Sequence, residues 1–334
     1  MRKRLIAAVF STALLLTQLT GCSSGGEGME SKVYTIGINQ FAVHPSLDNC
    51  RLGFIEGLKQ EGFEENKNVK YDYQNAAADG NICNQIAQKF ISAGYDMLLG
   101  IATPSAQACY NVAEEKGTPV IYSAVSDPVK AGLTGPDGGP GKTVTGTSDV
   151  LPLDKQVAMI RKFLPDAKRL GILYTTSEVN SESQINQLND IVPKYGFELV
   201  TTGVTSDAEI PQAADSLLSK VDCVNNLTDN TVVQNLGLII DKANAAGIPV
   251  FGSEEEQLKL GCVASESIDY FQLGVQTGKM AARVLKGEDV KTIPFETISQ
   301  SSPVINKTAL AKLGIAIPAD LDPNVKNIDT ETGN

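Results

Sequence analysis

Residues 95–123 read YDMLLGIATPSAQACYNVAEEKGTPVIYS, and residues 221–253 read VDCVNNLTDNTVVQNLGLIIDKANAAGIPVFGS. Each stretch begins with an apolar run, passes through a Thr-containing turn into a segment with helical spacing, and ends with Gly-x-Pro-Val and a second apolar run. Asp96 and Pro119 are 23 positions apart in the first stretch, and Asp222 and Pro249 are 27 positions apart in the second. Strands separated by helices of this length predict βαβ units and parallel sheets. We therefore expect one strand–helix–strand plan to occur in both halves of the chain.

The same alternation continues outward from these two stretches. The first half is expected to hold strands at 33–38, 69–73, 95–101 and 118–124, with helices at 44–61, 81–93 and 105–116. The second half is expected to hold strands at 169–174, 197–202, 221–227 and 248–252, with helices at 181–195, 208–219 and 232–246. The glycine-rich segment 135–141 suits neither a helix nor a central strand, so it marks the join. The expected fold class is α/β, with two doubly wound parallel-sheet lobes joined by a multi-strand hinge.

The chain is expected to pass between these lobes more than once. The segment 144–149 reads as an extended crossover, the chain returns near 265–269, and a last crossing follows Pro294. The predicted first lobe therefore combines residues 33–147 with 269–292. The predicted second lobe combines residues 148–268 with 293–330.

Composition excludes several classes of function. The chain has 334 residues, a formal net charge of −11, a single histidine and no tryptophan. Nucleic-acid binding requires a cationic face, which this balance argues against. A His-rich metal centre is excluded, and Gly141-Lys142-Thr143 lacks both the earlier glycine and the following helix of a phosphate-binding loop. Since the nucleophile-elbow pattern G-x-S-x-G is also absent, we expect no metal, no cofactor and no catalytic centre.

The first residues have the pattern of an export signal. Basic residues at 2–4 precede an apolar run over 5–16, which is too short to span a bilayer. Leu19-Thr20-Gly21-Cys22 follows and resembles the lipobox of bacterial lipoproteins. This resemblance implies a signal peptide over 1–21, acyl chains such as palmitate on Cys22, and a flexible tether over 22–32. The mature chain would then be held by lipid on the extracytoplasmic face of the cell membrane.

The other five cysteines contain no C-x-x-C pair, so the spacing of a zinc site or a redox dithiol is missing. Buried, small apolar side chains are the favoured interpretation of most of them. A disulfide between Cys50 and Cys83 is conceivable in an exported protein, and an odd count leaves at least one thiol free.

The strand-to-helix junctions are the candidate binding positions, because ligands of open parallel sheets bind at the carboxyl ends of the strands. In the first stretch, Thr103 is expected to cap a helix with Pro104 at its first position. Free backbone amides at such a helix start suit a carboxylate. Asp229 holds the equivalent place in the second stretch and offers a negative charge to an ammonium group. The alternative that Thr103 and Asp229 only cap their helices remains open.

Two further features have a structural interpretation beside a functional one. His44 precedes a proline just before a helix, so it is either a structural turn residue or a contact in a cleft. Residues 254–256 are three consecutive glutamates, for which a solvated acidic turn is favoured over a metal site.

Seven blocks of sequence, taken in order, resemble the substrate-binding lipoproteins of ABC transporters associated with tryptophan or tyrosine transport. These blocks are residues 44–48 (HPSLD), 53–58 (GFIEGL), 102–107 (ATPSAQ), 126–129 (SDPV), 145–149 (TGTSD), 228–232 (TDNTV) and 269–274 (DYFQLG). The resemblance implies a type I periplasmic-binding-protein fold, with two lobes, a hinge of three crossings, and a ligand held between the lobes. Members of this family are similar to binders of aromatic amino acids.

The resemblance also implies roles for particular residues. The ligand's carboxylate would bind at Thr103, Pro104, Ser105 and Ala106, and its amine at Asp229 and Asn230, with Asp127 or Asp149 assisting. The residues bordering the side-chain pocket would be Gln40, Phe41 and His44. One departure is Asn225-Asn226, where the family usually has apolar or aromatic residues. Because buried polar groups need partners, we expect Asn226 to face the cleft, where it counts against an aromatic ligand. Ser253 is added to the candidate set.

The function expected from the sequence is that of an extracytoplasmic, lipid-anchored solute-binding protein of an ABC importer. It would close as a monomer around a small zwitterion, an aromatic or apolar amino acid, and deliver it to a permease and its ATPase without any chemical step. Two alternatives stay open: a ligand-sensing lipoprotein that feeds a signalling receptor, and an α/β enzyme.

Overall fold

The computed structural model describes residues 32–135, 137–298 and 300–330. The expected signal peptide, Cys22 and all of the tether except Lys32 lie outside the described residues. Among the described residues, no helix is both long enough and apolar enough to cross a membrane.

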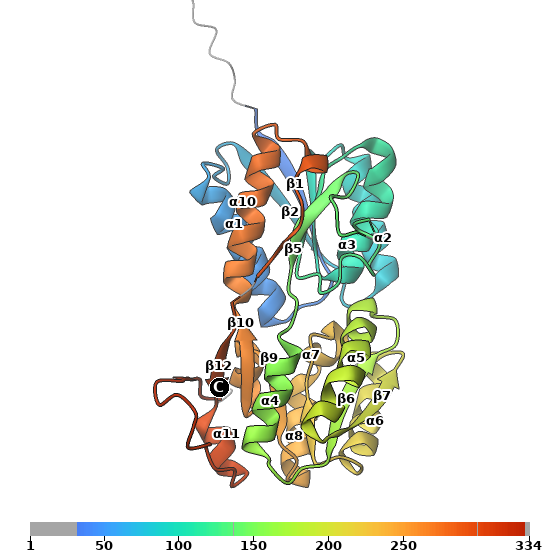
Figure 1. The fold of residues 1–334 in the computed structure, drawn as a ribbon. Coiled ribbons are helices and arrows are strands. Elements are labelled where there is room, and N and C mark those ends of the chain that lie inside the picture. Colours follow the sequence, from blue (N-terminus) through green and yellow to red (C-terminus); the bar gives the residue numbers. More distant parts are fainter. Residues whose placement is uncertain (1–31, 136, 299, 331–334) are drawn as a thin grey trace, which may run out of the picture. The chain divides into compact units, whose positions relative to one another are not determined.

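The first sheet has six strands in the order β11-β5-β4-β3-β1-β2, and all of its pairings are parallel. Helices cover both faces of this sheet: α1 and α10 lie side by side on one face, and α2 and α3 lie on the other (Figure 1). The bounds are β1 (Tyr34–Gln40), α1 (Pro45–Gln60), β2 (Val69–Asn75), α2 (Gly80–Ser92), β3 (Met97–Ile101), α3 (Thr103–Ala113), η1 (Glu114–Lys116), β4 (Val120–Ser123), β5 (Val144–Ser148), α10 (Tyr270–Leu285), η4 (Val290–Thr292) and β11 (Glu296–Thr297).

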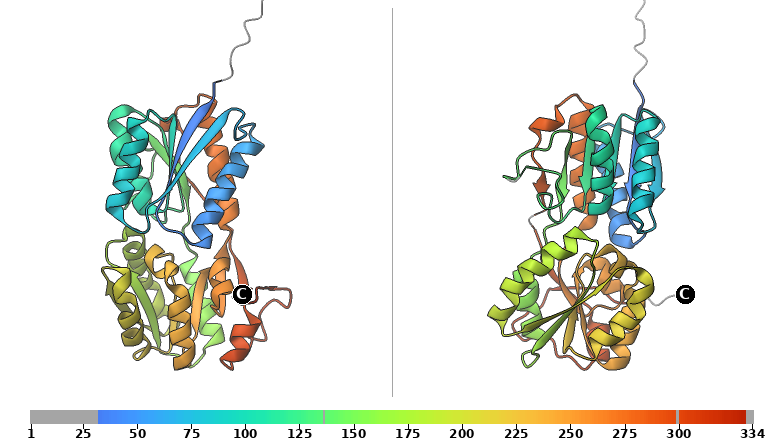
Figure 2. Two further views of the ribbon diagram at one scale, coloured as in Figure 1. Left: turned by 180° about the vertical axis from the view of Figure 1, so that it is seen from behind. Right: turned by 90° about the vertical axis from the view of Figure 1, so that its right-hand side faces the viewer.

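The second sheet has seven strands in the order β13-β12-β10-β9-β8-β6-β7, and its one antiparallel pairing among the described residues joins β10 to β12. Helices again cover both faces, as the two views in Figure 2 show. The bounds are α4 (Leu153–Phe163), β6 (Arg169–Thr175), α5 (Val179–Ile191), η2 (Val192–Tyr195), β7 (Glu198–Val204), η3 (Asp207–Glu209), α6 (Ile210–Leu218), β8 (Cys223–Asn225), α7 (Asn230–Gln234), α8 (Leu236–Ala246), β9 (Val250–Glu254), α9 (Glu255–Leu260), β10 (Ala264–Ile268), β12 (Ser302–Ile305), α11 (Lys307–Lys312) and β13 (Lys326–Asn327).

The two sheets share one plan. The order β2-β1-β3-β4-β5 in the first matches β7-β6-β8-β9-β10 in the second. In each sheet the first strand of the lobe lies between its second and third strands, which is the switch point of a doubly wound sheet. The α/β fold class with two parallel-sheet lobes is confirmed.

Helices α1 and α10 are packed with their backbones in contact. A Cβ atom added at Gly53, Gly57, Gly274 or Gly278 would overlap a backbone oxygen of the facing helix. Only glycine permits this approach. The pairing fixes the start of α1 beside the start of α10, and both ends carry residues of the candidate site described below.

Three segments connect the two sheets. The first runs over 149–152 between β5 and α4, and the second is Asp269 between β10 and α10. The third lies between β11 and β12, where residues 298 and 300–301 are described. The last crossing comes later than predicted, because β11 still pairs with β5 of the first sheet. The exact division of the chain into lobes stays a prediction.

Several local expectations need correction. The helix expected over 232–246 is two helices, α7 and α8, which meet at Asn235. Helix α3 begins at Thr103, and its N-cap residue is Ala102 with φ of 76°, so Thr103 is not the cap. The conceivable disulfide between Cys50 and Cys83 is absent. The five described cysteines are all free and buried, as small apolar residues would be.

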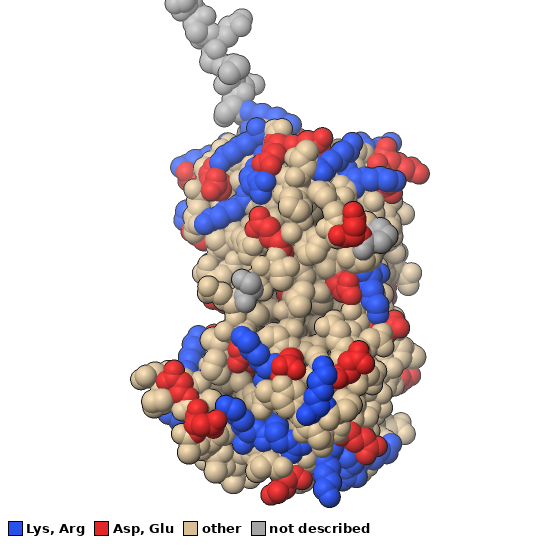
Figure 3. Space-filling view, viewed as in Figure 1, with Lys and Arg blue, Asp and Glu red and all other residues tan. Residues whose placement is uncertain are grey.

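The charged side chains of both signs are interspersed on the face shown in Figure 3. Fewer of them lie across the middle of this view than above and below it.

Candidate functional site

A small, partly open cavity lies among residues of both lobes. It has a volume of about 20 Å³, which is room for one or two water molecules. Its walls come from the starts of α1, α7 and α10 and from segments that follow β4, β5, β6, β8 and β9. The lining residues are His44, Ser46, Leu47, Ala124, Ser126, Asp149, Asn180, Thr228, Asn230, Val233, Glu254, Gln257 and Tyr270.

Three buried polar atoms of these lining residues have no hydrogen-bond partner among the described residues. They are Nδ1 of His44, Oδ1 of Asp149 and Oδ1 of Asn180. Buried polar groups are almost always paired, so each exception requires an explanation. Their gathering around one cavity is the arrangement expected of a site that binds a polar ligand.

Asp149 is held at the first crossing between the lobes, directly after β5. The hydroxyl of Tyr270, the first residue of α10, donates a hydrogen bond of 2.6 Å to its Oδ2. Burial raises the pKa of Asp149 to about 6, against the opposing effects of this hydrogen bond, of the Ser126 hydroxyl and of its own backbone N–H. Asp149 therefore has one oxygen fixed and one oxygen available.

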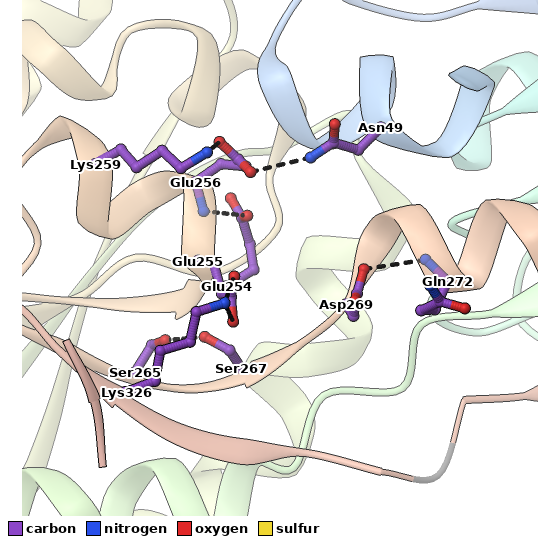
Figure 4. Close-up of polar contacts among 10 residues, drawn as sticks. All are labelled: Asn49, Glu254, Glu255, Glu256, Lys259, Ser265, Ser267, Asp269, Gln272 and Lys326. Carbon is purple, nitrogen blue, oxygen red and sulfur yellow. Dashed lines mark hydrogen bonds and ion pairs between the residues drawn. The ribbon is translucent and has the colours of Figure 1, made fainter. Parts of the chain in front are cut away.

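Glu254 is the last residue of β9 and the N-cap of α9. Its Oε2 accepts a hydrogen bond of 2.9 Å from the backbone N–H of Glu256 (Figure 4). The hydroxyl of Ser46 donates to its Oε1 at 2.8 Å, from the other lobe. Burial raises the pKa of Glu254 to about 7. The solvated acidic turn expected at 254–256 is thus wrong for Glu254, which is 2% exposed. The alternation of strand β9 continues two residues beyond the predicted end and turns this side chain inward.

His44 is a cleft contact, the second of its two interpretations. It precedes α1, and its Nε2 lies 3.5 Å from Oδ1 of Asn230 across the lobes. Burial lowers the pKa of His44 to about 4, so the ring is neutral at pH 7. No Lys or Arg is among the residues lining the cavity. Its ionisable side chains are therefore two carboxyl groups, one neutral imidazole and the Tyr270 phenol, a set that accepts positive charge.

Asp229 does not line the cavity, and its carboxylate is already occupied. It accepts hydrogen bonds from Thr175 N (2.6 Å), Thr175 Oγ1 (2.9 Å), Ser181 Oγ (2.7 Å) and Val232 N (3.0 Å). These four bonds cap α7 and tie it to β6 and α5. The geometry does not support Asp229 as the amine-binding group and favours the alternative of capping.

Glu178, which the sequence analysis did not single out, holds two lining residues in place. It accepts hydrogen bonds from Asn180 Nδ2 and from Asn230 N and Nδ2, and two more from Thr231. Burial and the neighbouring Asp229 raise the pKa of Glu178 above its ordinary value. Because Nδ2 of Asn180 is directed to Glu178, Oδ1 of Asn180 is the atom left without a partner.

The junction over 103–106 does not reach the cavity. Ser105 is fully buried, donates to Asn39 Oδ1 at 3.2 Å and contacts the thiol of Cys83 at 3.2 Å. Ala106 packs so closely on β3 that a Cβ on Gly100 would lie 2.6 Å from its Cα. Thr103 is buried, and Pro104 borders a separate open depression. The carboxylate-binding role predicted for these four residues therefore lacks support in the geometry.

The remaining predicted residues lie around the cavity without lining it. Gln40 donates to the Ala42 carbonyl and to Asp48, and Phe41 is buried in the core. The side-chain Nδ2 of Asn226 donates to the backbone carbonyl of Leu227. The backbone carbonyl of Asn226 accepts a hydrogen bond of 2.7 Å from Ser253 Oγ. Of the predicted set, the structure brings His44, Asp149 and Asn230 together at the cavity.

Hydrogen bonds link the lobes on two sides of the cavity. On one side, Asn49 of α1 donates to Glu256 of α9 at 3.0 Å (Figure 4). On the other, Ser183 of α5 donates to Asp127 at 2.6 Å, and Gln184 donates to Ser126 at 3.2 Å. Asp127 therefore bonds between lobes instead of lining the cavity.

A larger groove of about 750 Å³ lies along α10, β11 and the crossing segments. Arg283 in its wall pairs with Glu296, which also lines the groove, and with Glu288. It is open, and it includes none of the predicted site residues. Among the described residues, no group of three or more His, Cys, Asp or Glu side chains is placed to hold a metal ion. The smaller cavity is the candidate site.

Comparison with known proteins agrees with this architecture. Residues 35–326 match the family described as ABC transporter substrate binding protein. The chain belongs to this family. A tyrosine-binding protein from Clostridioides difficile (strain R20291) is 38% identical over 98% of this chain and 97% of its own length.

Two solved structures are also similar to this chain. One, from Streptococcus pneumonia, is in complex with L-Trp; it is 33% identical, covers 89% of this chain and 99% of its own, and has a TM-score of 0.85. The other is the ligand-free, open structure of a substrate-binding protein with adhesive properties from Clostridium difficile. It is 37% identical, covers 90% of this chain and 100% of its own, and has a TM-score of 0.67.

Proposed function

We propose that this ABC transporter substrate-binding protein takes up a zwitterionic amino acid, aromatic or apolar, in the cavity between its lobes and delivers it to a permease. It acts as a monomer, without a chemical step, on the extracytoplasmic face of the membrane, where acyl chains on Cys22 hold it. The observation that carries the proposal is the set of unpartnered buried atoms of His44, Asp149 and Asn180 around one cavity.

The lining residues suit both parts of such a ligand. Leu47, Ala124 and Val233 offer apolar surface to a side chain. The hydroxyl oxygen of Thr228 accepts a hydrogen bond of 2.8 Å from Gln184, so its O–H remains as a donor for a carboxylate. The names of two relatives support an aromatic amino acid, since one binds tyrosine and one is in complex with L-Trp.

The size of the cavity requires the lobes to separate before an amino acid enters. About 20 Å³ is far less than an aromatic amino acid occupies. The fold of this chain matches the open relative with a TM-score of 0.67 and the L-Trp complex with a TM-score of 0.85. The open relative is nevertheless slightly more similar in sequence, at 37% identity against 33%. A different angle between the lobes would produce this pattern. The inter-lobe bonds of Asn49, Ser183 and Gln184 then break on opening. The contacts of Ser46 with Glu254 and of His44 with Asn230 break with them.

Thermal unfolding of the purified chain against the twenty amino acids tests the ligand class. A ligand at 100 times its Kd adds about 2.7 kcal/mol to the free energy of unfolding, which raises Tm by several degrees. We expect this response with L-tyrosine or L-tryptophan and not with glutamate, whose extra charge would face Asp149 and Glu254. No response to any amino acid would contradict the proposal.

Metabolic labelling tests the anchor. Cells given an alkyne analogue of palmitate should label the wild-type chain, and the chain should sediment with membranes. The Cys22→Ser variant should lose both properties. Equal labelling of this variant would rule out Cys22 as the acylated residue.

A further inference from the structure

We propose that the ligand's ammonium group binds between Asp149 and Glu254, and that a proton leaves this pair of carboxyl groups when it binds. This inference rests on the proposed function, because it takes the ligand to be an amino acid. It adds the position of the ammonium group and a dependence of affinity on pH.

The position follows from what each carboxyl group still lacks. Asp149 comes from the crossing after β5 and Glu254 from the end of β9, and both line the same cavity. Oδ1 of Asp149 has no hydrogen-bond partner of good geometry among the described residues, although the Ser126 hydroxyl is close enough to stabilise the ionised carboxylate. Oε1 of Glu254 accepts one donor, the hydroxyl of Ser46. An ammonium group has three donors and no acceptor, so it complements these oxygens.

The cavity supplies no positive charge of its own. His44 is neutral, and the nearby basic side chains pair with acids outside the cavity: Arg51 with Asp48, Lys259 with Glu256, and Lys326 with Glu255. Figure 4 shows Lys259 reaching Glu256, and Lys326 pairs with Glu255.

The other ionisable groups near the two carboxyls are neutral or negative. Asp149 faces Tyr270 of α10 and is close to Cys50 of α1, and burial raises the pKa of both groups. Glu254 faces Ser46 of α1, with Glu255 and Glu256 of α9 beside it and Cys262 nearby. On the α5 and α7 side, Glu178 and Asp229 lie behind Asn180 and Asn230. A bound cation is therefore the group that would favour ionisation of both carboxyls.

The proton balance follows directly. With the lobes closed and no ligand between them, burial favours the protonated form of each carboxyl group, and the pKa values are about 6 for Asp149 and about 7 for Glu254. An ammonium group at hydrogen-bonding distance favours the ionised form and lowers both values. Near pH 7 the protonated fraction of the pair is released as H⁺ to solvent, and the ligand's ammonium keeps all of its protons. Affinity then rises with pH between about 6 and 8 and levels off above that range.

Calorimetric titration with L-tyrosine and L-tryptophan at pH 7 measures the released proton. The observed enthalpy is compared among buffers of different ionisation enthalpy, and the slope gives the protons released per ligand. We expect about half a proton or more for the wild type. We also expect the deaminated analogue 3-(4-hydroxyphenyl)propanoate to bind at least tenfold more weakly than L-tyrosine, and with no proton release.

The Glu254→Gln variant removes one titrating group and should reduce both the released protons and the rise of affinity with pH. The control is Glu255→Gln, which removes the adjacent carboxyl group outside the cavity and should behave as the wild type. Asp149→Asn serves as a second variant, and Tm shows that each variant is folded.

The outcomes separate this inference from the proposed function. Tight binding of L-tyrosine or L-tryptophan with no proton release, or with a slope unchanged in both variants, overturns the inference and leaves the function intact. Equal affinity for the deaminated analogue overturns the ammonium position. Absence of binding by any amino acid overturns both.

Discussion

The two stretches with one sequence plan, 95–123 and 221–253, have similar strand–helix–strand folds, but only the second contributes residues to the cavity. In the first, β3, α3 and β4 form a tightly packed unit in which Ala106 lies against Gly100. In the second, the helical segment is divided into α7 and α8, and Asp229 and Glu178 tie the first turn of α7 to β6 and α5. The second stretch supplies three of the lining residues, Thr228, Asn230 and Val233, and the first supplies none. A shared plan therefore predicts shared strands and helices, and it does not predict which copy binds.

The largest expected difference between the copies is at their buried polar junctions. Asp229→Ala leaves Thr175, Ser181 and the N–H of Val232 without their acceptor, and should lower the free energy of unfolding by about 3 kcal/mol or more. Ser105→Ala, the matched change in the first stretch, should cost about 1 kcal/mol. Chemical denaturation measures both.

If Asp229 bound the ligand's amine, as the sequence suggested, Asp229→Ala would instead lose binding with little loss of stability. If Asp229→Ala proves as stable as the wild type and no longer binds an amino acid, the capping role argued here is wrong. Asp229→Asn, which keeps the size of the side chain, should lie between Asp229→Ala and the wild type in stability.

A second difference concerns ionisation. Asp149 and Glu254, whose pKa values are raised, both line the cavity and lie outside the first stretch. The folded-state pKa of Glu254, about 7, exceeds its ordinary value of 4.5. Its contribution to stability is therefore fully present below pH 4.5 and is lost as the pH rises through 7. The free energy of unfolding of the wild type minus that of Glu254→Gln should fall by about 3 kcal/mol between pH 4.5 and 8.

Taking this difference cancels the opposing effect of His44, whose lowered pKa makes stability fall as the pH drops from 6.5 to 4. Denaturation of the ligand-free chain at several pH values provides the data. A difference that stays constant or grows with pH would show that Glu254 is ionised in the folded protein throughout.

The smallest expected difference is in backbone packing. Gly100→Ala places a Cβ 2.6 Å from the Cα of Ala106 and should cost about 2 kcal/mol, because a backbone neighbour cannot move aside easily. In the second stretch, Gly252→Ala meets the side-chain Oε1 of Gln257 at 3.1 Å and should cost less than about 1 kcal/mol. Equal losses of Tm in the two variants would argue against the tighter packing of the first stretch.

The sequence predicts the fold better than the site for a physical reason. Apolar runs, helical spacing and glycine-rich turns are local signals, and they predicted most strands and helices, as well as the α/β class. The site depends on which side chains meet across the lobes, and local signals do not contain this information. Thr103 and Ser105 have a suitable sequence at a suitable junction, but close packing of α3 on β3 buries them away from the cavity.

Glu254 shows the opposite error. A run of three glutamates is typical of a solvated surface, and Glu255 and Glu256 do pair with lysines there. The strand β9 extends to Glu254 and places this one carboxyl group inside. Glu178 was missed because its role depends on hydrogen bonds to residues some fifty positions away. His44 and Asp149 were predicted through the resemblance to the family.

The most direct test of the account is a crystal structure of this chain grown with L-tyrosine or L-tryptophan. The account predicts the amino acid in the cavity lined by both lobes, with its ammonium within hydrogen-bonding distance of Asp149 and Glu254 and with Asp229 still bonded to Thr175 and Ser181. A ligand whose carboxylate lies on the residues at 103–106 and whose ammonium lies on Asp229 would contradict it.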